Sequence, residues 1–232
     1  MLAAGEYKNH SRPLQPEPGQ TETTLPRVLC ILSSVLEKLV ARNDKLVDSL
    51  SQKEDGQSCS SAQLGKRLNT FHGIRAPNIS IPKYLERIYK YTNCSPSCFV
   101  VGYVYIDRLL HRHPDSLVVS LNVHRLLVSS VMVASKMLDD VPYNNAFYAR
   151  VGGVSNAELN KLELELLFLL DFGVMVSSQV FESYCSHLEK EMLFNGTGLK
   201  IERPIISNIV DDHVTEISVE DTQSFSPPQI AD

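Results

Sequence analysis

The stretch that decides the fold is NVHRLLVSSVMVASKMLDD, from Asn122 to Asp140. Apolar side chains stand on nearly every side of the helix that this stretch predicts, whereas a surface helix carries a single apolar stripe. The helix is therefore expected to lie among other helices, at the centre of an all-α core. The first strong polar run begins at Lys136 and ends with Asp139 and Asp140. This run marks the point where the helix reaches the surface, and a functional site is expected there.

Composition limits the class of protein. The chain has 232 residues, of which 43% are hydrophobic, enough for one domain of ordinary size with tails. Its net charge of -5 provides no overall positive field that would attract nucleic acid or an anionic membrane. Five cysteines without a recurring spacing, and no secretory signal, predict a reducing intracellular location, in the nucleus or the cytoplasm. No apolar run approaches the roughly 20 residues that cross a bilayer.

Helical spacing and capping residues predict further helices on both sides of this stretch. Before it, they are expected from Pro26 to Ala41, from Ser80 to about Thr92, and from the cap Ser95-Pro96 to just before His113-Pro114. After it, they are expected from Ala146 to Val151, from Asn156 to Asp171 behind a capping box of Ser155 and Glu158, and from Ser178 to Met192. The helix after the capping box is predicted to be buried on almost all sides. Gly102 predicts a close approach of another helix, because glycine is otherwise unfavourable inside a helix.

The segments between and beyond these helices complete the domain organisation. Residues 1–24 are predicted to be a disordered arm, 25–70 a helix and linker, 71–192 the folded core, and 193–232 a disordered acidic tail. The turn-rich segment Phe71 to Pro77 is expected to lie along the core as extended chain, because it includes Phe71 and Ile74.

Candidates for catalysis or metal binding are few. They are Cys94, Cys98, His111, His113 and His124. The two cysteines are spaced C-x3-C, unlike common zinc pairs, and the first two histidines lie on different faces of their helix. No nucleophile elbow, zinc-protease motif or phosphate-binding glycine loop is present. The chain is therefore expected to be no enzyme and to need neither metal nor cofactor.

Several short sequence motifs together resemble a cyclin box. They are Tyr84 to Ile88 (YLERI), Cys94 to Arg108 (CSPSCFVVGYVYIDR), Ala134 to Asp140 (ASKMLDD), Leu159 to Glu163 (LNKLE) and Asp171-Phe172. The order of helices, short, long, buried, short, buried, is similar to the five helices of that box. The motif Phe71-His-Gly73, followed by Ile79-Ser-Ile81, resembles the corresponding sequence of the plant P-type (U-type) cyclins, relatives of the yeast phosphate-signalling cyclin.

The resemblance implies a single five-helix cyclin box with an extra N-terminal and one C-terminal helix. It also implies a regulatory subunit that forms a heterodimer with a cyclin-dependent kinase of the PSTAIRE class and activates it, in cell division or phosphate signalling. By motif, Lys136 and Glu163 match the family's kinase-contacting pair, with Glu165 as the alternative to Glu163. Leu126, Met137 and Leu166 are core candidates with a secondary role in kinase binding.

Other readings of these residues stay open at this stage. Lys136 could simply complement the helix dipole, and Glu163 could pair with nearby Lys161. Cyclin-like folds also occur in transcription factors that bind DNA, but the basic residues here are scattered and balanced by acids. A helical scaffold for a partner other than a kinase is a third possibility, because a fold alone does not settle function.

Overall fold

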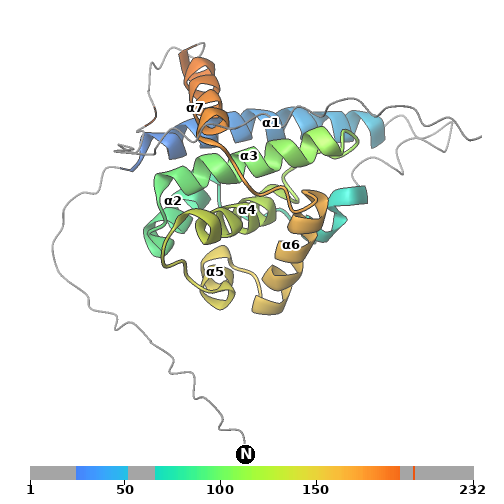
Figure 1. Cartoon of the computed structure of the whole chain (residues 1–232). Coiled ribbons are helices and arrows are strands. Elements are labelled where there is room, and N and C mark those ends of the chain that lie inside the picture. Colours follow the sequence, from blue (N-terminus) through green and yellow to red (C-terminus); the bar gives the residue numbers. More distant parts are fainter. Residues whose placement is uncertain (1–24, 52–65, 194–200, 202–232) are drawn as a thin grey trace, which may run out of the picture. The chain divides into compact units, whose positions relative to one another are not determined.

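The computed structural model describes residues 25–51, 66–193 and 201, and the regular elements among them are all helices (Figure 1). The elements in chain order are α1 (Arg27–Ser51), the 3-10 helix η2 (Lys66–Phe71), α2 (Ile81–Thr92), α3 (Pro96–Arg112), α4 (Val123–Leu138), α5 (Asn145–Gly152), α6 (Asn156–Leu169) and α7 (Ser178–Leu193). The described residues contain no strand, which confirms the all-α prediction. The predicted disordered arm, most of the linker and the acidic tail lie outside them. Ile201 is the exception: it is buried, and its N–H donates to Glu189 Oε1.

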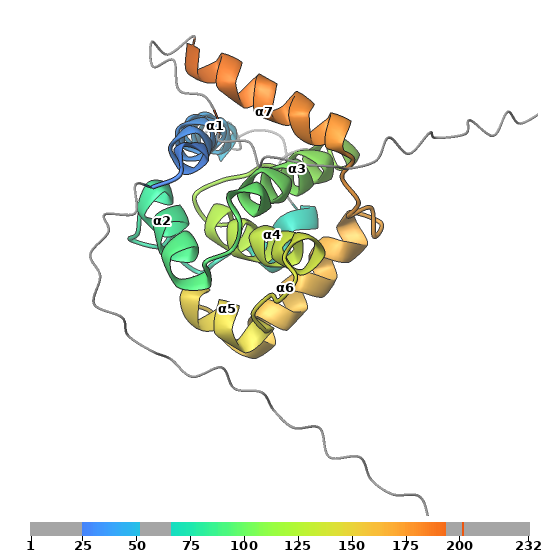
Figure 2. The ribbon, with the colours of Figure 1, turned by 60° about the vertical axis from the view of Figure 1, so that its left-hand side comes forward.

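Helix α4 is the central helix, as its sequence predicts. Every residue from Val123 to Ser135 except Arg125 is buried. Figure 2 shows α4 with α3 above it, α2 to the left, α5 below and α6 at the lower right, while α1 and α7 lie beyond α3. Burial stops at Lys136, so the helix reaches the surface where the polar run begins.

Helices α3 and α4 approach each other closely at Gly102. A Cβ added to Gly102 would lie 3.2 Å from Val131 Cγ2 and 3.3 Å from Ser130 Oγ. Such distances are tighter than ordinary side-chain contacts, so a larger residue would push the helices apart. The predicted role of Gly102 is confirmed.

Helix α1 is longer than predicted, because Asn43 and Asp44 do not end it. Asn43 Nδ2 donates to Val118 O at 2.8 Å, and Asp44 accepts from the N–H and the hydroxyl of Ser120. Both side chains therefore form hydrogen bonds with Val118 and Ser120 of a distant loop and do not cap their own helix. From the sequence alone this polar pair predicts a helix stop, because its partners lie more than 70 positions away and leave no local signal.

The caps agree with the sequence only in part. Ser155 Oγ accepts from Glu158 N at 3.0 Å, but the Glu158 carboxylate pairs with Arg125 Nε at 2.7 Å. Ser95 takes the N-cap position of α3 without a cap hydrogen bond from its side chain, whose Oγ lies 3.3 Å from Cys98 Sγ. The helix starts were predicted correctly, whereas the tertiary contacts of these side chains were not.

Two further expectations are wrong. Helix α6 buries Leu159, Leu162, Leu166 and Leu169, but Leu164 and Phe168 are 55% and 66% exposed, so it is not covered on all sides. In the segment expected to be extended, Phe71 is the last residue of η2 and is fully buried, while Ile74 is fully exposed. Only Phe71 lies along the core.

Candidate functional site

Two residues predicted to act together meet where α4 reaches the surface. Lys136 Nζ lies 2.5 Å from Glu163 Oε1, and this ion pair joins the last turn of α4 to the middle of α6. The side chains are 33% and 17% exposed, so solvent screens the pair only in part. Because an ammonium group has three N–H donors, Lys136 keeps donors for a further acceptor.

Asn145 completes the arrangement around Glu163. Its Nδ2 donates to Glu163 Oε2 at 2.6 Å and to Asn160 Oδ1 at 2.8 Å. Both carboxylate oxygens of Glu163 are therefore engaged, one from α4 and the other from the start of α5. The sequence offered no signal for this contact, because Asn145 reads only as a residue at a helix start.

Exposed apolar side chains gather in the same part of the chain. Among the described residues, eight of the fourteen large hydrophobic residues that are exposed lie between the end of α4 and the loop after α6. They are Met137, Leu138, Val141, Tyr143, Leu164, Phe168, Phe172 and Met175. We call these eight residues the apolar face, a set defined by its place in the chain: Leu138, Val141 and Tyr143 line a hollow at the start of α3, whereas Phe172 and Met175 line one at its end. Exposed apolar side chains beside an ion pair, such as Met137 and Leu164 beside Lys136 and Glu163, are typical of a surface for another macromolecule.

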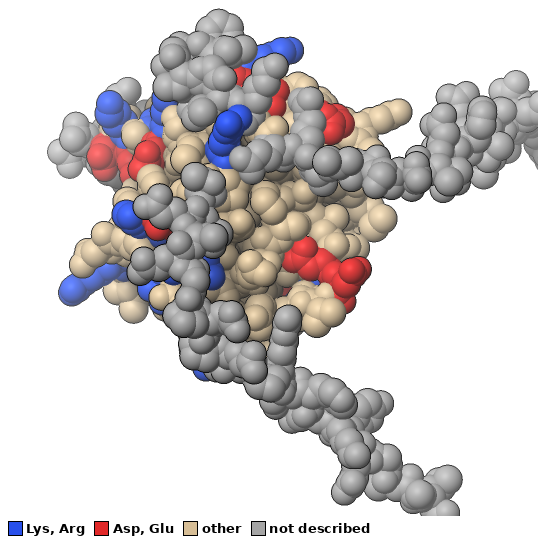
Figure 3. All heavy atoms as spheres, turned by 90° about the vertical axis from the view of Figure 1, so that its left-hand side faces the viewer, with Lys and Arg blue, Asp and Glu red and all other residues tan. Residues whose placement is uncertain are grey.

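Figure 3 shows the side of the molecule on which α4 ends. Among the described residues, side chains other than Lys, Arg, Asp and Glu cover much of the centre of this view, and groups of charged side chains lie to either side.

Phe172 is held in an unusual backbone conformation. Asp171 and Phe172 both have positive φ, 51° and 56°. This left-handed region is unfavourable for residues other than glycine, and such strain is concentrated at functional sites. The Phe172 N–H donates to Leu167 O at 2.8 Å, and its ring contacts the Phe168 ring edge to face, with centroids 5.4 Å apart. The turn thereby presents two aromatic rings to solvent side by side.

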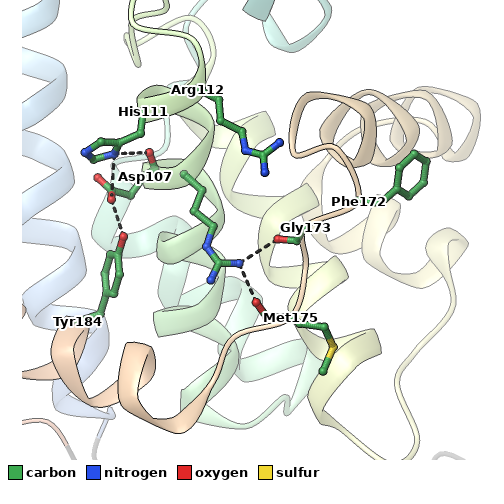
Figure 4. Close-up of a pocket in the computed structure, with 8 residues that line it drawn as sticks. Asp107, His111, Arg112, Phe172, Gly173, Met175 and Tyr184 are labelled. Atoms are coloured by element: carbon green, nitrogen blue, oxygen red, sulfur yellow. Dashed lines mark hydrogen bonds and ion pairs between the residues drawn. The ribbon is translucent and has the colours of Figure 1, made fainter. Parts of the chain in front are cut away.

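Helix α3 fixes the segment that follows this turn (Figure 4). Arg108 Nη1 donates to Gly173 O at 2.9 Å and to Met175 O at 2.8 Å. The Tyr105 hydroxyl donates to Val174 O at 2.8 Å, and burial raises the pKa of Tyr105 to about 12, so the hydroxyl keeps its proton at neutral pH. Three successive carbonyl groups are therefore bound by α3.

A hollow of about 450 Å³ lies beside these contacts, between α3, the α6–α7 segment and Tyr184 of α7. At one side, the Tyr184 hydroxyl donates to Asp107 Oδ2 at 2.6 Å, while His111 Nδ1 lies 3.3 Å from the same carboxylate. Burial, together with the nearby Asp107 carboxylate, raises the pKa of Tyr184 above its ordinary value. These contacts attach α7 to α3 on one side of the hollow, and Phe172 and Met175 line it from the α6–α7 segment.

The other predicted contact residues separate into two groups. Met137 is 44% exposed and belongs to the apolar face. Leu126 and Leu166 have no exposed surface, so in this structure they are core residues and offer a partner no contact. Phe168, Phe172 and Asn145 were not predicted, although the Phe168–Phe172 spacing of four residues was visible in the sequence.

The three histidines among the candidates for metal or nucleophilic chemistry have separate partners. His124 Nε2 bonds Ile79 O, His113 Nε2 bonds Leu169 O, and His111 lies beside Asp107. Within the described part of the chain, no three His, Cys, Asp or Glu residues are placed to hold a metal ion. None of the helices described there is both long and apolar enough to cross a bilayer.

Comparison with known proteins decides the family. The cyclin family profile matches residues 27–174, which include α1 to α6. This chain belongs to the cyclin family. Cyclin-U1-1 of Arabidopsis thaliana is 65% identical over 195 residues, which are 84% of this chain and 87% of that protein. Cyclin-U4-1 of the same plant is 49% identical, over 75% of this chain and 80% of that protein. Cyclin-P3-1 of Oryza sativa subsp. japonica is 47% identical, over 80% of this chain and 72% of that protein. The cyclin is thus of the plant P-type (U-type) branch.

Cyclins are regulatory subunits without catalytic activity of their own, and the family implies a cyclin-dependent kinase as partner. Membership therefore gives this cyclin a regulatory role, and the five-helix box corresponds to α2 to α6. The extra N-terminal helix is α1, and the C-terminal helix is α7.

Proposed function

We propose that this cyclin forms a heterodimer with a cyclin-dependent kinase of the PSTAIRE class and activates it, in the control of cell division or of phosphate signalling. The observation that carries the proposal is the Lys136–Glu163 pair at the edge of the apolar face. A kinase helix docked there would cover Met137, Leu164 and Phe168. The Lys136 ammonium would donate to a backbone carbonyl of the kinase.

Docking would act on the kinase by a shift of its conformational equilibrium. A ligand that binds only the active conformation raises the population of that conformation by its differential affinity. In protein kinases the active conformation needs an ion pair between the lysine that contacts ATP and a glutamate on the mobile C helix. The cyclin would supply binding energy for that helix position, in the nucleus or the cytoplasm, and no chemical group to the phosphoryl transfer.

The test is co-purification with a panel of PSTAIRE-class kinases, followed by phosphorylation of a histone substrate. Wild type is compared with Lys136→Ala and Glu163→Ala, and with Lys83→Ala as a matched control. Lys83 also forms an ion pair, with Glu86, but it lies on α2 with its side chain 71% exposed. We expect wild type and Lys83→Ala to bind and activate, and the other two variants to fail while folded. Absence of binding by folded wild type to every kinase of the panel contradicts the proposal.

A further inference from the structure

Two thiol groups that the regulatory role does not use lie together where α2 passes into α3. Cys94 precedes the N-cap residue of α3, and Cys98 is in the first turn of that helix. Both residues are buried, 4% and 0% exposed, and both are free thiols. The two sulfur atoms are within hydrogen-bonding reach of each other. In redox-sensitive cysteine pairs, one thiol is oxidised to a sulfenic acid and the neighbouring thiol then attacks that sulfur to form a disulfide.

The surroundings of this pair are polar, unlike those of a cysteine that only fills a core. Cys98 Sγ donates to Asp139 Oδ2 at 3.5 Å and lies 3.3 Å from Ser95 Oγ. The Cys94 N–H donates to Thr92 Oγ1 at 3.4 Å. Thr92, Ser95 and Asp139 also line a hollow of about 350 Å³ between the end of α2 and the end of α4. The thiols therefore lie directly behind the lining of a hollow that is large enough for a peroxide molecule.

We propose that Cys94 and Cys98 form a reversible intramolecular disulfide when the protein meets hydrogen peroxide, and that this disulfide weakens binding of the kinase. The first part concerns the cyclin alone. The second part rests on the proposed function, because it requires that the kinase docks beside the end of α4.

The chemistry balances with peroxide as the oxidant. The Cys94 thiolate attacks the O–O bond, which gives a sulfenic acid and, after proton transfer, one water. Cys98 then attacks the Cys94 sulfur and loses its proton to the Asp139 carboxylate, and the sulfenic oxygen leaves as a second water. Two thiols lose two electrons and one peroxide gains them. Because Cys98 is the thiol that already donates to Asp139, it is placed to lose its proton in the second step, and Cys94 is assigned the first step. The hydrogen bond from Cys98 lowers the pKa of Cys94, which favours the same order.

The disulfide reaches the partner surface through Asp139. This residue is the C-cap of α4, with its N–H bonded to Ser135 O at 2.9 Å. Its carboxylate accepts from the Ser95 N–H at 3.4 Å and from Cys98 Sγ, so it joins the start of α3 to the end of α4. A disulfide removes the thiol donor. Asp139, next to the end of α4 that carries Lys136 and Met137, then loses one of the two hydrogen bonds that its carboxylate makes to the start of α3.

The first experiment measures the disulfide itself in the full chain with Cys30→Ser and Cys59→Ser, which removes two other thiols. The protein is treated with hydrogen peroxide, alkylated, and analysed by mass spectrometry after proteolysis. We expect the loss of two hydrogens in a peptide that links Cys94 to Cys98, and its recovery with dithiothreitol. Overoxidation of Cys94 without the link overturns the proposal, as does resistance of both thiols at peroxide concentrations that oxidise the urea-unfolded chain.

The second experiment measures affinity for the kinase in the oxidised and reduced protein. We expect oxidation to weaken binding about fivefold, the effect of one lost hydrogen bond at a helix end. Cys98→Ser in the same background is expected to bind equally well with and without peroxide. A disulfide that forms without changing affinity overturns the second part of the proposal. If no kinase binds the reduced protein, the proposed function has failed, and the mass measurement still decides the disulfide.

Discussion

Lys136 Nζ and Glu163 Oε1 lie 2.5 Å apart although 27 positions separate the two residues in the chain. The ion pair joins the C-terminal end of the buried α4 to α6, a helix on which Leu164 and Phe168 are exposed. Asn145 holds the second carboxylate oxygen at 2.6 Å, so the Glu163 side chain has a single well-defined position. A partner that docks at this edge meets charges that are already oriented, which lowers the entropy lost on binding.

Removal of either charge is expected to affect binding far more than folding. Lys136→Ala and Glu163→Ala should each lower the free energy of unfolding by less than about 1 kcal/mol, because the pair is partly solvated. Each should weaken kinase binding about tenfold or more, and the double variant should be no weaker than the worse single variant, because the two charges act as a unit. Calorimetric titration with the kinase and urea unfolding measure the two effects. Additive losses of affinity would show that the residues contact the kinase independently.

The aromatic pair at the end of α6 is expected to be a binding hot spot. Phe172→Ala should cost about 2 kcal/mol of kinase affinity, as truncation of a central aromatic residue commonly does. Its ring is 58% exposed, so the free energy of unfolding should change by no more than about 1 kcal/mol. The matched control is Ile74→Ala, because Ile74 is a fully exposed apolar residue outside the apolar face. Equal affinities of the two variants would exclude Phe172 from the interface.

Two arginines of α3 that line the same hollow are expected to differ in their contribution to stability. Arg108→Gln removes charge-assisted hydrogen bonds to two carbonyl groups, Gly173 O and Met175 O, and should cost about 2 kcal/mol. Arg112 pairs with Asp171 at 3.6 Å, with side chains 47% and 86% exposed, so Arg112→Gln should change stability by less than about 0.5 kcal/mol. Urea unfolding of both variants tests the difference. Similar costs would mean that the Arg108 contacts do not stabilise the α6–α7 segment.

The close contact of α3 with α4 makes Gly102 sensitive to size. Gly102→Leu should lower the free energy of unfolding by about 1–3 kcal/mol, the usual cost of excess volume in a packed core. His111→Leu, at an exposed position of the same helix, should change it by about 0.5 kcal/mol or less. Urea unfolding followed by circular dichroism compares the two. A Gly102→Leu variant as stable as wild type would show that the helices separate at little cost.

His124 is expected to make stability depend on pH. Burial lowers its pKa, and Nε2 bonds Ile79 O while Nδ1 is buried and has no hydrogen-bond partner among the described residues. The unfolded chain therefore binds a proton on this residue at a higher pH than the folded chain does. Its contribution to stability is complete well above the ordinary histidine pKa of about 6.5 and is lost as the pH falls from there toward the lowered value.

Thermal unfolding between about pH 8 and pH 5 measures this dependence. In His124→Gln, whose amide can replace the Nε2 donor, the loss of stability at low pH should be smaller than in wild type. An identical pH profile in the variant would assign the dependence to other groups.

Local signals in the sequence were enough for the helices and for the burial of α4. Pro82, Ser95-Pro96 and Ser155 mark helix starts that the structure confirms, because a cap depends on backbone groups within one turn. Apolar residues on every side of Asn122 to Asp140 required a surrounding shell of helices, since burial is the only way to remove such a surface from water. The resemblance to a cyclin box, which rests on short motifs in these helices, also predicted Lys136 and Glu163 as a pair.

The partners of polar side chains required the folded chain. Asn43 and Asp44 read as a helix stop because their acceptor and donors lie in a loop more than 70 positions away. Glu158 is predicted to form half of a capping box, but its carboxylate pairs with Arg125 of α4 instead. Periodicity states which leucines share a face of α6, whereas only packing shows that Leu166 is covered and Phe168 is not. The reason is physical: a cap or a stripe is made by residues one turn apart, but coverage depends on which distant helix occupies the neighbouring space.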